Sequence, residues 1–159
     1  MKLRASPCVL DLPAIPSSVS AARAAMVEYG VRCGADRDDV AIGTSEAVTN
    51  AVKHAYPDSH PGLIRVSAAR DGNDLVIAVR DEGVGMRPSH ANRGLGMGLF
   101  LINAVADWVT LEPVGASAGV EVSMRFPCGG SRRAPARPTE IFDRPEQRKP
   151  LDHHLSSSG

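Results

Sequence analysis

The chain has 159 residues, of which 43% are hydrophobic and 23% are charged, so its composition predicts one globular domain and argues against disorder throughout. Basic and acidic side chains number 18 each, and this balance excludes a strong global attraction to nucleic acid or anionic lipid. The first residues lack an apolar stretch of signal-peptide length, and the apolar run at 95–106 is too short to span a bilayer. We therefore expect a cytoplasmic protein without a membrane partner. The charge balance predicts that it has no direct nucleic-acid partner either.

Strand and helix patterns alternate along the first 127 residues. Short apolar segments predict five strands, at residues 9–12, 63–69, 75–79, 109–111 and 120–126. Apolar residues at helical spacing predict three helices, at about 17–30, 36–55 and 99–108. In chain order the elements read βααββ, a glycine-rich loop, and αββ. This order predicts an α/β two-layer sandwich, with a mixed, mostly antiparallel sheet and the helices on one of its faces.

Local signals set the ends of several elements. Ser17 or Ser18 can cap the first helix. Acidic residues at 36–39 suit the positive end of the second helix dipole, and Pro57 ends that helix. The Asp-Gly pair at 71–72 predicts a tight hairpin between the second and third strands.

Residues 128–159 differ in composition from the rest of the chain. They are rich in proline, arginine, glycine and serine and poor in large apolar residues, so they cannot bury enough surface to offset the entropy of ordering. We therefore expect an ordered domain at 1–127 and a flexible tail at 128–159. Ile141 and Phe142 are the single apolar point of this tail, which is either a short docking motif or part of a passive tail.

Two polar side chains in the second helix are candidates for chemistry. The core stripe of this helix is expected at Val40, Thr44, Ala47, Val48 and Ala51. Glu46 and Asn50 are four residues apart and share a face roughly opposite that stripe. A carboxylate can accept a proton, and an amide oxygen can bind Mg²⁺ without adding charge. Taken alone, such a pair is more often a solvated polar face.

A second candidate follows the third strand, where the chain runs into an Asp-x-Gly-x-Gly pattern at Asp81, Gly83 and Gly85. The strand end can direct the Asp81 carboxylate inward, and the glycines let the backbone approach a planar ring. The carboxylate could accept a hydrogen bond from the exocyclic amine of adenine. Taken alone, an ordinary turn explains this segment more often.

A third candidate is the Gly-x-Gly-x-Gly pattern at Gly94, Gly96 and Gly98, which opens onto a helix. Backbone N–H groups at a helix N-terminus bind anions, most often phosphate. The pattern differs from the dinucleotide fingerprint because Leu99 occupies the last position, and from a P-loop because no Gly-Lys-Ser/Thr occurs in the chain. Taken alone, a flexible turn explains it about as well.

Together the three patterns resemble, in order, spacing and type of element, the N, G1 and G2 boxes of the Bergerat-fold (GHKL) ATP-binding domains, which include gyrase and the sensor histidine kinases. The segment at 45–51, followed by His54, Ala55 and Tyr56, is most similar to the anti-sigma-factor serine kinases. The resemblance covers about residues 8–126 and implies the Bergerat fold, with ATP and Mg²⁺ as cofactors.

The resemblance also implies a role for each matching position. Glu46 corresponds to the general base, Asn50 to the Mg²⁺ ligand, and Asp81 to the aspartate that recognises adenine. The other positions matched to nucleotide binding are Gly83, Gly85, Gly94, Gly96, Met97 and Gly98.

Two functions are compatible with this resemblance. The first is an ATP-dependent anti-sigma regulatory protein, a protein serine/threonine kinase that phosphorylates an anti-anti-sigma partner and binds a sigma factor. The alternative is a non-catalytic, nucleotide-dependent binding module that sequesters a sigma factor or another regulator. Glu46 favours the kinase, whereas the few residues at 87–93, where the family has a longer lid, favour the module. We do not expect a sensor histidine kinase, because the residues ahead of Asp36 are too few for its dimerisation helices. A homodimer is one expected assembly, since relatives commonly form homodimers.

Overall fold

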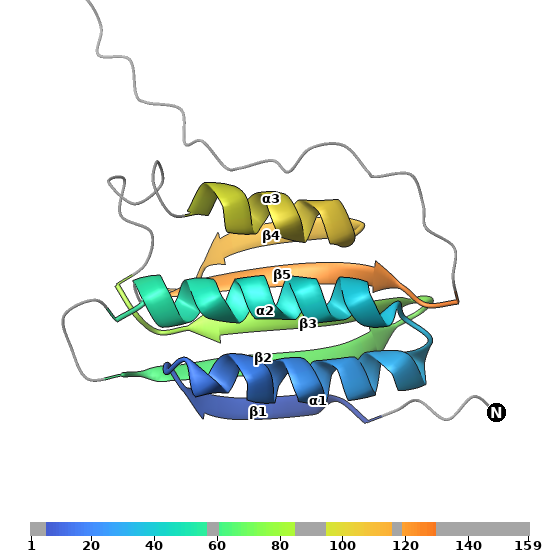
Figure 1. Cartoon of the computed structure of the whole chain (residues 1–159), viewed down its shortest axis with the longest axis horizontal. Helices are drawn as coiled ribbons and strands as arrows, with labels where there is room; N and C mark the ends of the chain where they lie inside the picture. Colours follow the sequence, from blue (N-terminus) through green and yellow to red (C-terminus); the bar gives the residue numbers. More distant parts are fainter. Residues whose placement is uncertain (1–5, 57–60, 85–94, 116–118, 130–159) are drawn as a thin grey trace, which may run out of the picture.

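A computed structural model of the chain describes residues 6–56, 61–84, 95–115 and 119–129, without the side chains of 95–97. One sheet forms the first layer, and three helices lie together on one of its faces (Figure 1). The strands are β1 (Cys8–Pro13), β2 (Leu63–Asp71), β3 (Asp74–Asp81), β4 (Trp108–Pro113) and β5 (Val120–Pro127). The helices are α1 (Ser17–Cys33), α2 (Arg37–His54) and α3 (Leu95–Val105). The predicted two-layer α/β sandwich and its order of elements are confirmed.

The strands are ordered β1-β2-β3-β5-β4 across the sheet, and each neighbouring pair in the described part of the chain is antiparallel. The expectation of a mixed sheet is therefore wrong on this point, whereas its antiparallel character is confirmed. Strands β3 and β4 do run in the same direction, as a connection through α3 favours. They are not neighbours, because β5 turns back from β4 and occupies the position between them.

The core lies between the sheet and the helices. The second and third strands form the predicted hairpin, in which Asp71 pairs with Asp74 and Gly72 has the positive φ of 60° that glycine adopts readily. All five residues of the predicted α2 stripe are buried: Val40, Thr44, Ala47, Val48 and Ala51. Among the largest side chains that they meet in the fully buried core are Tyr29, Met26, Ile64, Ile77, Met124 and Phe126.

The ends of the first two helices show one wrong prediction and one confirmed prediction. Helix α1 begins after Pro16 without a side-chain cap, so neither Ser17 nor Ser18 has the predicted capping role. The Ser18 hydroxyl instead donates to the Pro13 carbonyl at 2.6 Å and fixes the chain that enters the helix. Helix α2 starts in the predicted acidic segment, with Asp38 and Asp39 in its first turn. Asp36 also caps the helix, because its carboxylate accepts from two backbone N–H groups.

Helix α3 begins at Leu95, four residues before the predicted start. It ends at Val105 rather than at residue 108, and β4 begins at Trp108, one residue before the predicted strand. Gly96 and Gly98 therefore belong to the helix rather than to a turn that precedes it. Glycine lowers helix propensity by about 1 kcal/mol, which favoured the later start. The packing of α3 against α2 outweighs this propensity, because helices in proteins gain most of their stability from tertiary contacts.

The folded unit extends slightly beyond β5. Cys128 is buried, forms an isolated bridge with Ala35, and donates its N–H to the Asn73 carbonyl at 2.8 Å. Cys128 and Gly129 thus contact the domain although the sequence boundary was drawn at 127. Residues 130–159, with the apolar pair at 141–142, lie outside the described part of the chain. Across the described ranges, no helix combines the length and the apolar character needed to cross a membrane.

Candidate functional site

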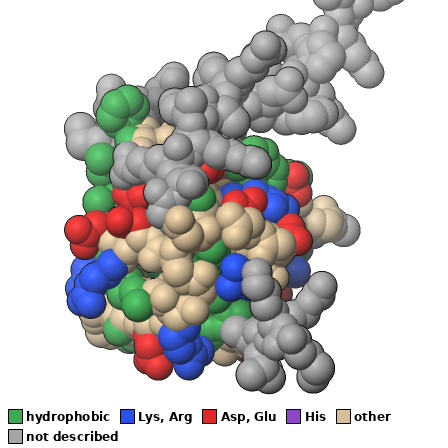
Figure 2. Space-filling model, turned by 90° about the vertical axis from the view of Figure 1, so that its right-hand side faces the viewer, with side chains coloured by type: hydrophobic (Ala, Val, Ile, Leu, Met, Phe, Trp, Pro, Cys, Tyr) green, Lys and Arg blue, Asp and Glu red, His purple; other side chains and the backbone are tan. Residues whose placement is uncertain are grey.

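Three segments that carry the candidate residues meet at one end of the molecule. The C-terminal end of α2, the end of β3 and the N-terminal end of α3 all lie on the left of Figure 1. The start of α2 and the β2–β3 hairpin lie at the opposite end, where acidic and basic side chains are interspersed (Figure 2). The fold therefore brings together the ends of α2, β3 and α3, although His54 and Leu95 are 41 residues apart in the sequence.

Glu46 and Asn50 point from α2 toward the first turns of α3. A Cβ atom built on Gly98 would lie 3.0 Å from Asn50 Nδ2 and 3.3 Å from Glu46 Oε2. The polar ends of both side chains thus gather at one point of the α3 backbone, which a side chain at Gly98 would crowd. The prediction that Glu46 and Asn50 share a face is confirmed, and their chemical roles remain predictions.

The Asn50 amide leaves one polar atom without a partner. Asn50 Nδ2 is buried and has no hydrogen bond within the described structure. A buried polar group that lacks a partner costs about 1–3 kcal/mol, so its presence beside Glu46 favours a site completed by a ligand. Rotation of the amide about its terminal bond exchanges Oδ1 and Nδ2, so either atom can face that ligand.

Mg²⁺ fits this donor set. Across the described ranges, no group of three or more His, Cys, Asp or Glu residues could form an all-protein metal cage. Mg²⁺ does not require such a cage, because it keeps several waters and is commonly held by one or two protein oxygens together with substrate phosphates. Asn50 Oδ1 is an oxygen ligand of this kind, and the missing side chain at Gly98 avoids a crowded contact with it.

Asp81 ends β3 on the side of the sheet that carries the helices. It pairs with the buried Ile64 and is only 8% exposed. Burial raises the pKa of the Asp81 carboxyl above its ordinary value of 3.8, and hydrogen bonds from the N–H groups of Gly83 and Val120 oppose that rise. Oδ1 accepts from the Gly83 N–H at 2.9 Å. An ionised carboxylate has about four acceptor positions, so Asp81 keeps capacity for a donor on a ligand.

Close backbone contacts explain Gly83. Its ideal Cβ would overlap the Ala55 carbonyl oxygen, and the next residue, Val84, donates its N–H to that same oxygen at 2.9 Å. The segment that follows Asp81 is therefore packed directly on the end of α2. A second contact of this type occurs at Gly119, where a Cβ would overlap the Asp81 carbonyl.

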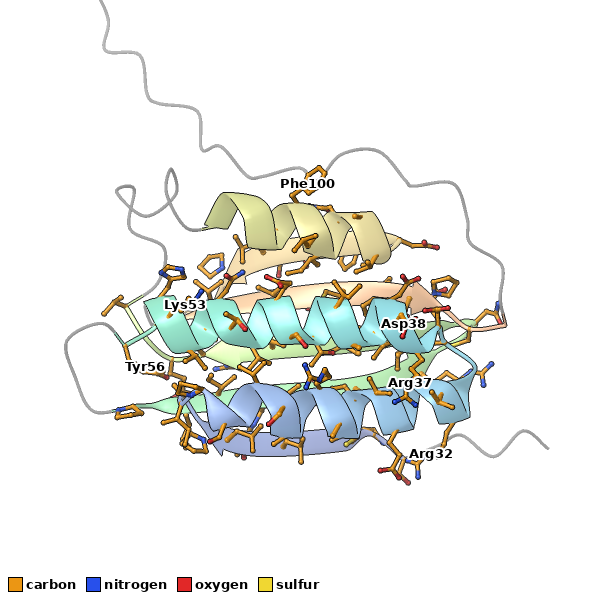
Figure 3. All side chains as sticks on the ribbon, viewed as in Figure 1. Arg32, Arg37, Asp38, Lys53, Tyr56 and Phe100 are labelled. Carbon is orange, nitrogen blue, oxygen red and sulfur yellow. The ribbon has the colours of Figure 1, made fainter. Side chains whose placement is uncertain are left out.

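Tyr56 is a residue of this site to which sequence reasoning assigned no role. Its hydroxyl donates to the Leu63 carbonyl at 2.8 Å and accepts from the Glu82 N–H at 3.1 Å. Figure 3 shows Tyr56 at the same end of the molecule as Lys53, near the C-terminus of α2. Because Glu82 lies 26 residues from Tyr56, no local pattern could have indicated the contact.

Some predicted site residues cannot be placed. Gly85 and Gly94 lie outside the described residues, as does the segment 87–93. The backbones of Gly96 and Met97 are helical, and nothing further is described at these two positions. Of the six additional nucleotide-binding positions, the contacts of Gly83 and Gly98 are thus the ones that the structure describes.

The described arrangement offers three functions to one ligand. The Asp81 carboxylate is a buried acceptor for an amine, the start of α3 offers backbone N–H groups suited to anions, and Glu46 is a carboxylate next to an amide that can bind a metal. An adenine nucleotide carries an amine at one end and phosphates at the other. The arrangement therefore has the chemical complementarity that adenine nucleotides require.

Comparisons with known proteins agree with this geometry. The family model described as a histidine kinase-like ATPase domain matches residues 12–126. Serine-protein kinase RsbW from Staphylococcus epidermidis is 35% identical over 134 residues, which cover 72% of this chain and 82% of the relative. The protein of the same name from Bacillus velezensis is 30% identical over 141 residues, which cover 77% of this chain and 86% of the relative.

A solved structure also resembles this fold. The crystal structure of the RsbU and RsbW domains of a Mycobacterium tuberculosis protein aligns with a TM-score of 0.57 and 25% sequence identity. The alignment covers 76% of this chain and 32% of that structure, so this chain corresponds to about a third of it.

Proposed function

The chain belongs to the histidine kinase-like ATPase family, and we propose that it is an ATP-dependent protein serine/threonine kinase that phosphorylates an anti-anti-sigma protein and binds a sigma factor in the cytoplasm. The observation that carries the proposal is the convergence of Glu46 and Asn50 on Gly98, at the end of the molecule where Asp81 ends β3. The similarity of this chain to the RsbW serine-protein kinases, over most of both chains, supports the same conclusion.

Each residue has one task in this proposal. Asp81 accepts a hydrogen bond from the adenine amine, and the backbone at the start of α3 binds phosphate oxygens. Asn50 provides an oxygen ligand to Mg²⁺, which when bound neutralises phosphate charge. Glu46 accepts the proton of the attacking serine or threonine hydroxyl, while the hydroxyl oxygen bonds to the γ-phosphorus and the bond from that phosphorus to ADP breaks.

Nucleotide calorimetry tests the binding half of the proposal. Wild-type protein should bind ATP in a Mg²⁺-dependent way and bind GTP more weakly. Adenine carries at C6 an amine that can donate to Asp81, whereas guanine carries a carbonyl oxygen at that position. Asp81→Asn should weaken ATP binding by about tenfold or more, since hydrogen bonds to charged groups contribute about 1.5–3 kcal/mol, and should change GTP binding little. Asp74→Asn, at the other end of β3, is the matched control and should leave both affinities unchanged. No binding at millimolar ATP would contradict the proposal.

Labelled ATP tests the catalytic half. Incubation of the wild-type protein with candidate anti-anti-sigma and sigma partners should label a serine or threonine of the anti-anti-sigma protein alone. A nucleotide-dependent complex with a sigma factor in which no partner is ever labelled would replace the kinase by a non-catalytic binding module.

A further inference from the structure

We infer that Tyr56 is a positioning residue for the Asp81 carboxylate, and that its hydroxyl thereby helps to set the preference of the site for ATP over GTP. The inference rests on the proposed function, because it deepens the role of Asp81 in recognising adenine. Tyr56 itself needs no contact with the nucleotide in this inference.

The Tyr56 hydroxyl connects three segments at the point where the site is built. Tyr56 follows the end of α2, Leu63 begins β2, and Glu82 follows the last residue of β3. One hydroxyl donates to the Leu63 carbonyl and accepts from the Glu82 N–H, at 2.8 and 3.1 Å. These two bonds add a side-chain link between the segment after Asp81 and the start of β2, next to the backbone pair of Asp81 with Ile64.

The Glu82 N–H belongs to the same peptide plane as the Asp81 carbonyl, so its bond to Tyr56 restrains the backbone of Asp81 directly. The next two N–H groups are also used. Gly83 donates to Asp81 Oδ1 at 2.9 Å, and Val84 donates to the Ala55 carbonyl at 2.9 Å. Three successive N–H groups thus hold the turn, and Ala55 and Tyr56 at the end of α2 accept two of them.

The tyrosine ring has a defined seat. A Cβ atom at Gly62 would overlap the ring of Tyr56, although the backbone of Gly62 does not have a positive φ. The ring is therefore the main obstacle to a side chain at this position. Burial raises the pKa of the Tyr56 hydroxyl above 10.0, so the hydroxyl remains protonated at neutral pH and can donate to Leu63.

Tyr56→Phe tests the inference because it keeps the ring and removes both hydrogen bonds of the hydroxyl. We expect ATP affinity to fall about three- to tenfold while GTP affinity and kcat at saturating ATP stay unchanged. Tyr29→Phe is the matched control, since Tyr29 is the other tyrosine of the chain and is buried on α1. Its loss of a hydroxyl should leave the ratio of ATP to GTP affinity as in the wild type.

Two further variants separate positioning from a general effect on stability. If Tyr56 acts through Asp81, Tyr56→Phe should reduce ATP affinity no further in an Asp81→Asn background. Gly62→Ala adds a methyl group that would overlap the Tyr56 ring and displace it, so this variant should also lower the ratio of ATP to GTP affinity.

Three outcomes would overturn the inference: equal losses of ATP and GTP affinity in Tyr56→Phe, an unchanged ATP affinity in Tyr56→Phe, or additive losses with Asp81→Asn. Each of these requires a wild-type protein that prefers ATP. A wild-type protein that binds no ATP would overturn the proposed function itself, so the two failures are distinguishable.

Discussion

The two faces of α2 are built from the same helix but satisfy their side chains in different ways. The face toward the sheet buries Val40, Ala47 and Val48 almost completely among apolar neighbours. The face toward α3 carries Glu46 and Asn50, and one buried atom of the Asn50 amide has no partner in the described structure. The first face is almost wholly apolar, although the buried Thr44 hydroxyl on it also has no hydrogen-bond partner in the described structure. The second face carries its unsatisfied amide atom beside the carboxylate of Glu46.

This difference predicts that the sheet-facing residues stabilise the fold and that Glu46 and Asn50 act in binding or catalysis. A change on the sheet-facing side should lower the free energy of unfolding and alter binding only through that loss. A change on the α3-facing side should alter binding or catalysis while stability stays the same or rises, because functional sites are where a protein tolerates unfavourable groups.

Glu46→Gln should have the largest effect and the cleanest separation. Glutamine keeps the size and hydrogen-bonding reach of the side chain but cannot accept the proton of the attacking hydroxyl. Loss of a general base lowers the rate by about 10²–10⁴ and leaves ground-state binding nearly intact. Phosphorylation of the anti-anti-sigma protein should therefore fall by that factor, while calorimetry should show wild-type ATP affinity.

Glu28→Gln provides the control for this experiment, because Glu28 is exposed on α1 and pairs only at 3.9 Å with Arg32. It should phosphorylate the partner at the wild-type rate. Equal rates for wild type and Glu46→Gln would show that Glu46 is not the general base.

A pair of alanine variants compares the two faces in a single measurement. Val48→Ala should lower the free energy of unfolding by about 2 kcal/mol, since it removes fully buried carbon atoms and leaves a cavity. Asn50→Ala should leave that free energy within about 0.5 kcal/mol of the wild type or raise it, because it removes a buried amide atom without a partner. Denaturant unfolding measures both.

Binding should show the reverse order. Asn50→Ala should weaken Mg·ATP binding because it removes the proposed metal ligand, whereas folded Val48→Ala should bind like the wild type. Asn103→Ala, whose amide lies on exposed α3 surface and donates to the Leu99 carbonyl, is the control for loss of an asparagine. A destabilised Asn50→Ala that still binds Mg·ATP normally would place Asn50 with the structural residues.

The sheet-facing side of α2 could be predicted from the sequence because burial repeats at the helical period. The hairpin could be predicted for a similarly local reason, since Asp71-Gly72 favours a tight turn. The start of α3 could not be predicted, because its glycines have low helix propensity and tertiary packing, mainly against α2, compensates for it. The neighbours of β3 and β4 depend on where β5 pairs, which no local pattern specifies.

The candidate site shows the same contrast between local patterns, which the sequence reveals, and contacts that form only on folding. Glu46 and Asn50 could be assigned to one face by their spacing, and Asp81 by its place after a strand. The contacts of Tyr56 could not be predicted, because they join the segments that follow α2 and β3 to the start of β2, and these become neighbours only after folding. Motifs thus indicated the groups expected to face a ligand, and the fold was needed to propose Tyr56 as the residue that positions Asp81.

The smallest expected effect is a pH dependence of stability that arises at Asp81. Burial raises its pKa above 3.8 in the folded state, so the folded protein binds this proton more tightly than the unfolded chain does. Between pH 3.8 and the raised pKa the contribution of Asp81 to stability therefore falls as pH rises, and above that window the unfavourable contribution of the ionised carboxylate is constant. Asp81→Asn should remove this trend and slightly raise the unfolding free energy at neutral pH, because it removes the unfavourable contribution of the ionised carboxylate.

Asp11→Asn should act in the opposite direction and is the control for this measurement. The hydrogen bond from Arg65 lowers the pKa of Asp11, so Asp11 contributes stability above pH 3.8 that is lost as pH falls through its lowered pKa. Denaturant unfolding at several pH values from 3 to 7 should therefore show differences from the wild type that have opposite signs for the two variants. Differences of the same sign would show that Asp81 is stabilised by the protein in its ionised form, and its carboxylate would then belong with the groups that the fold alone satisfies.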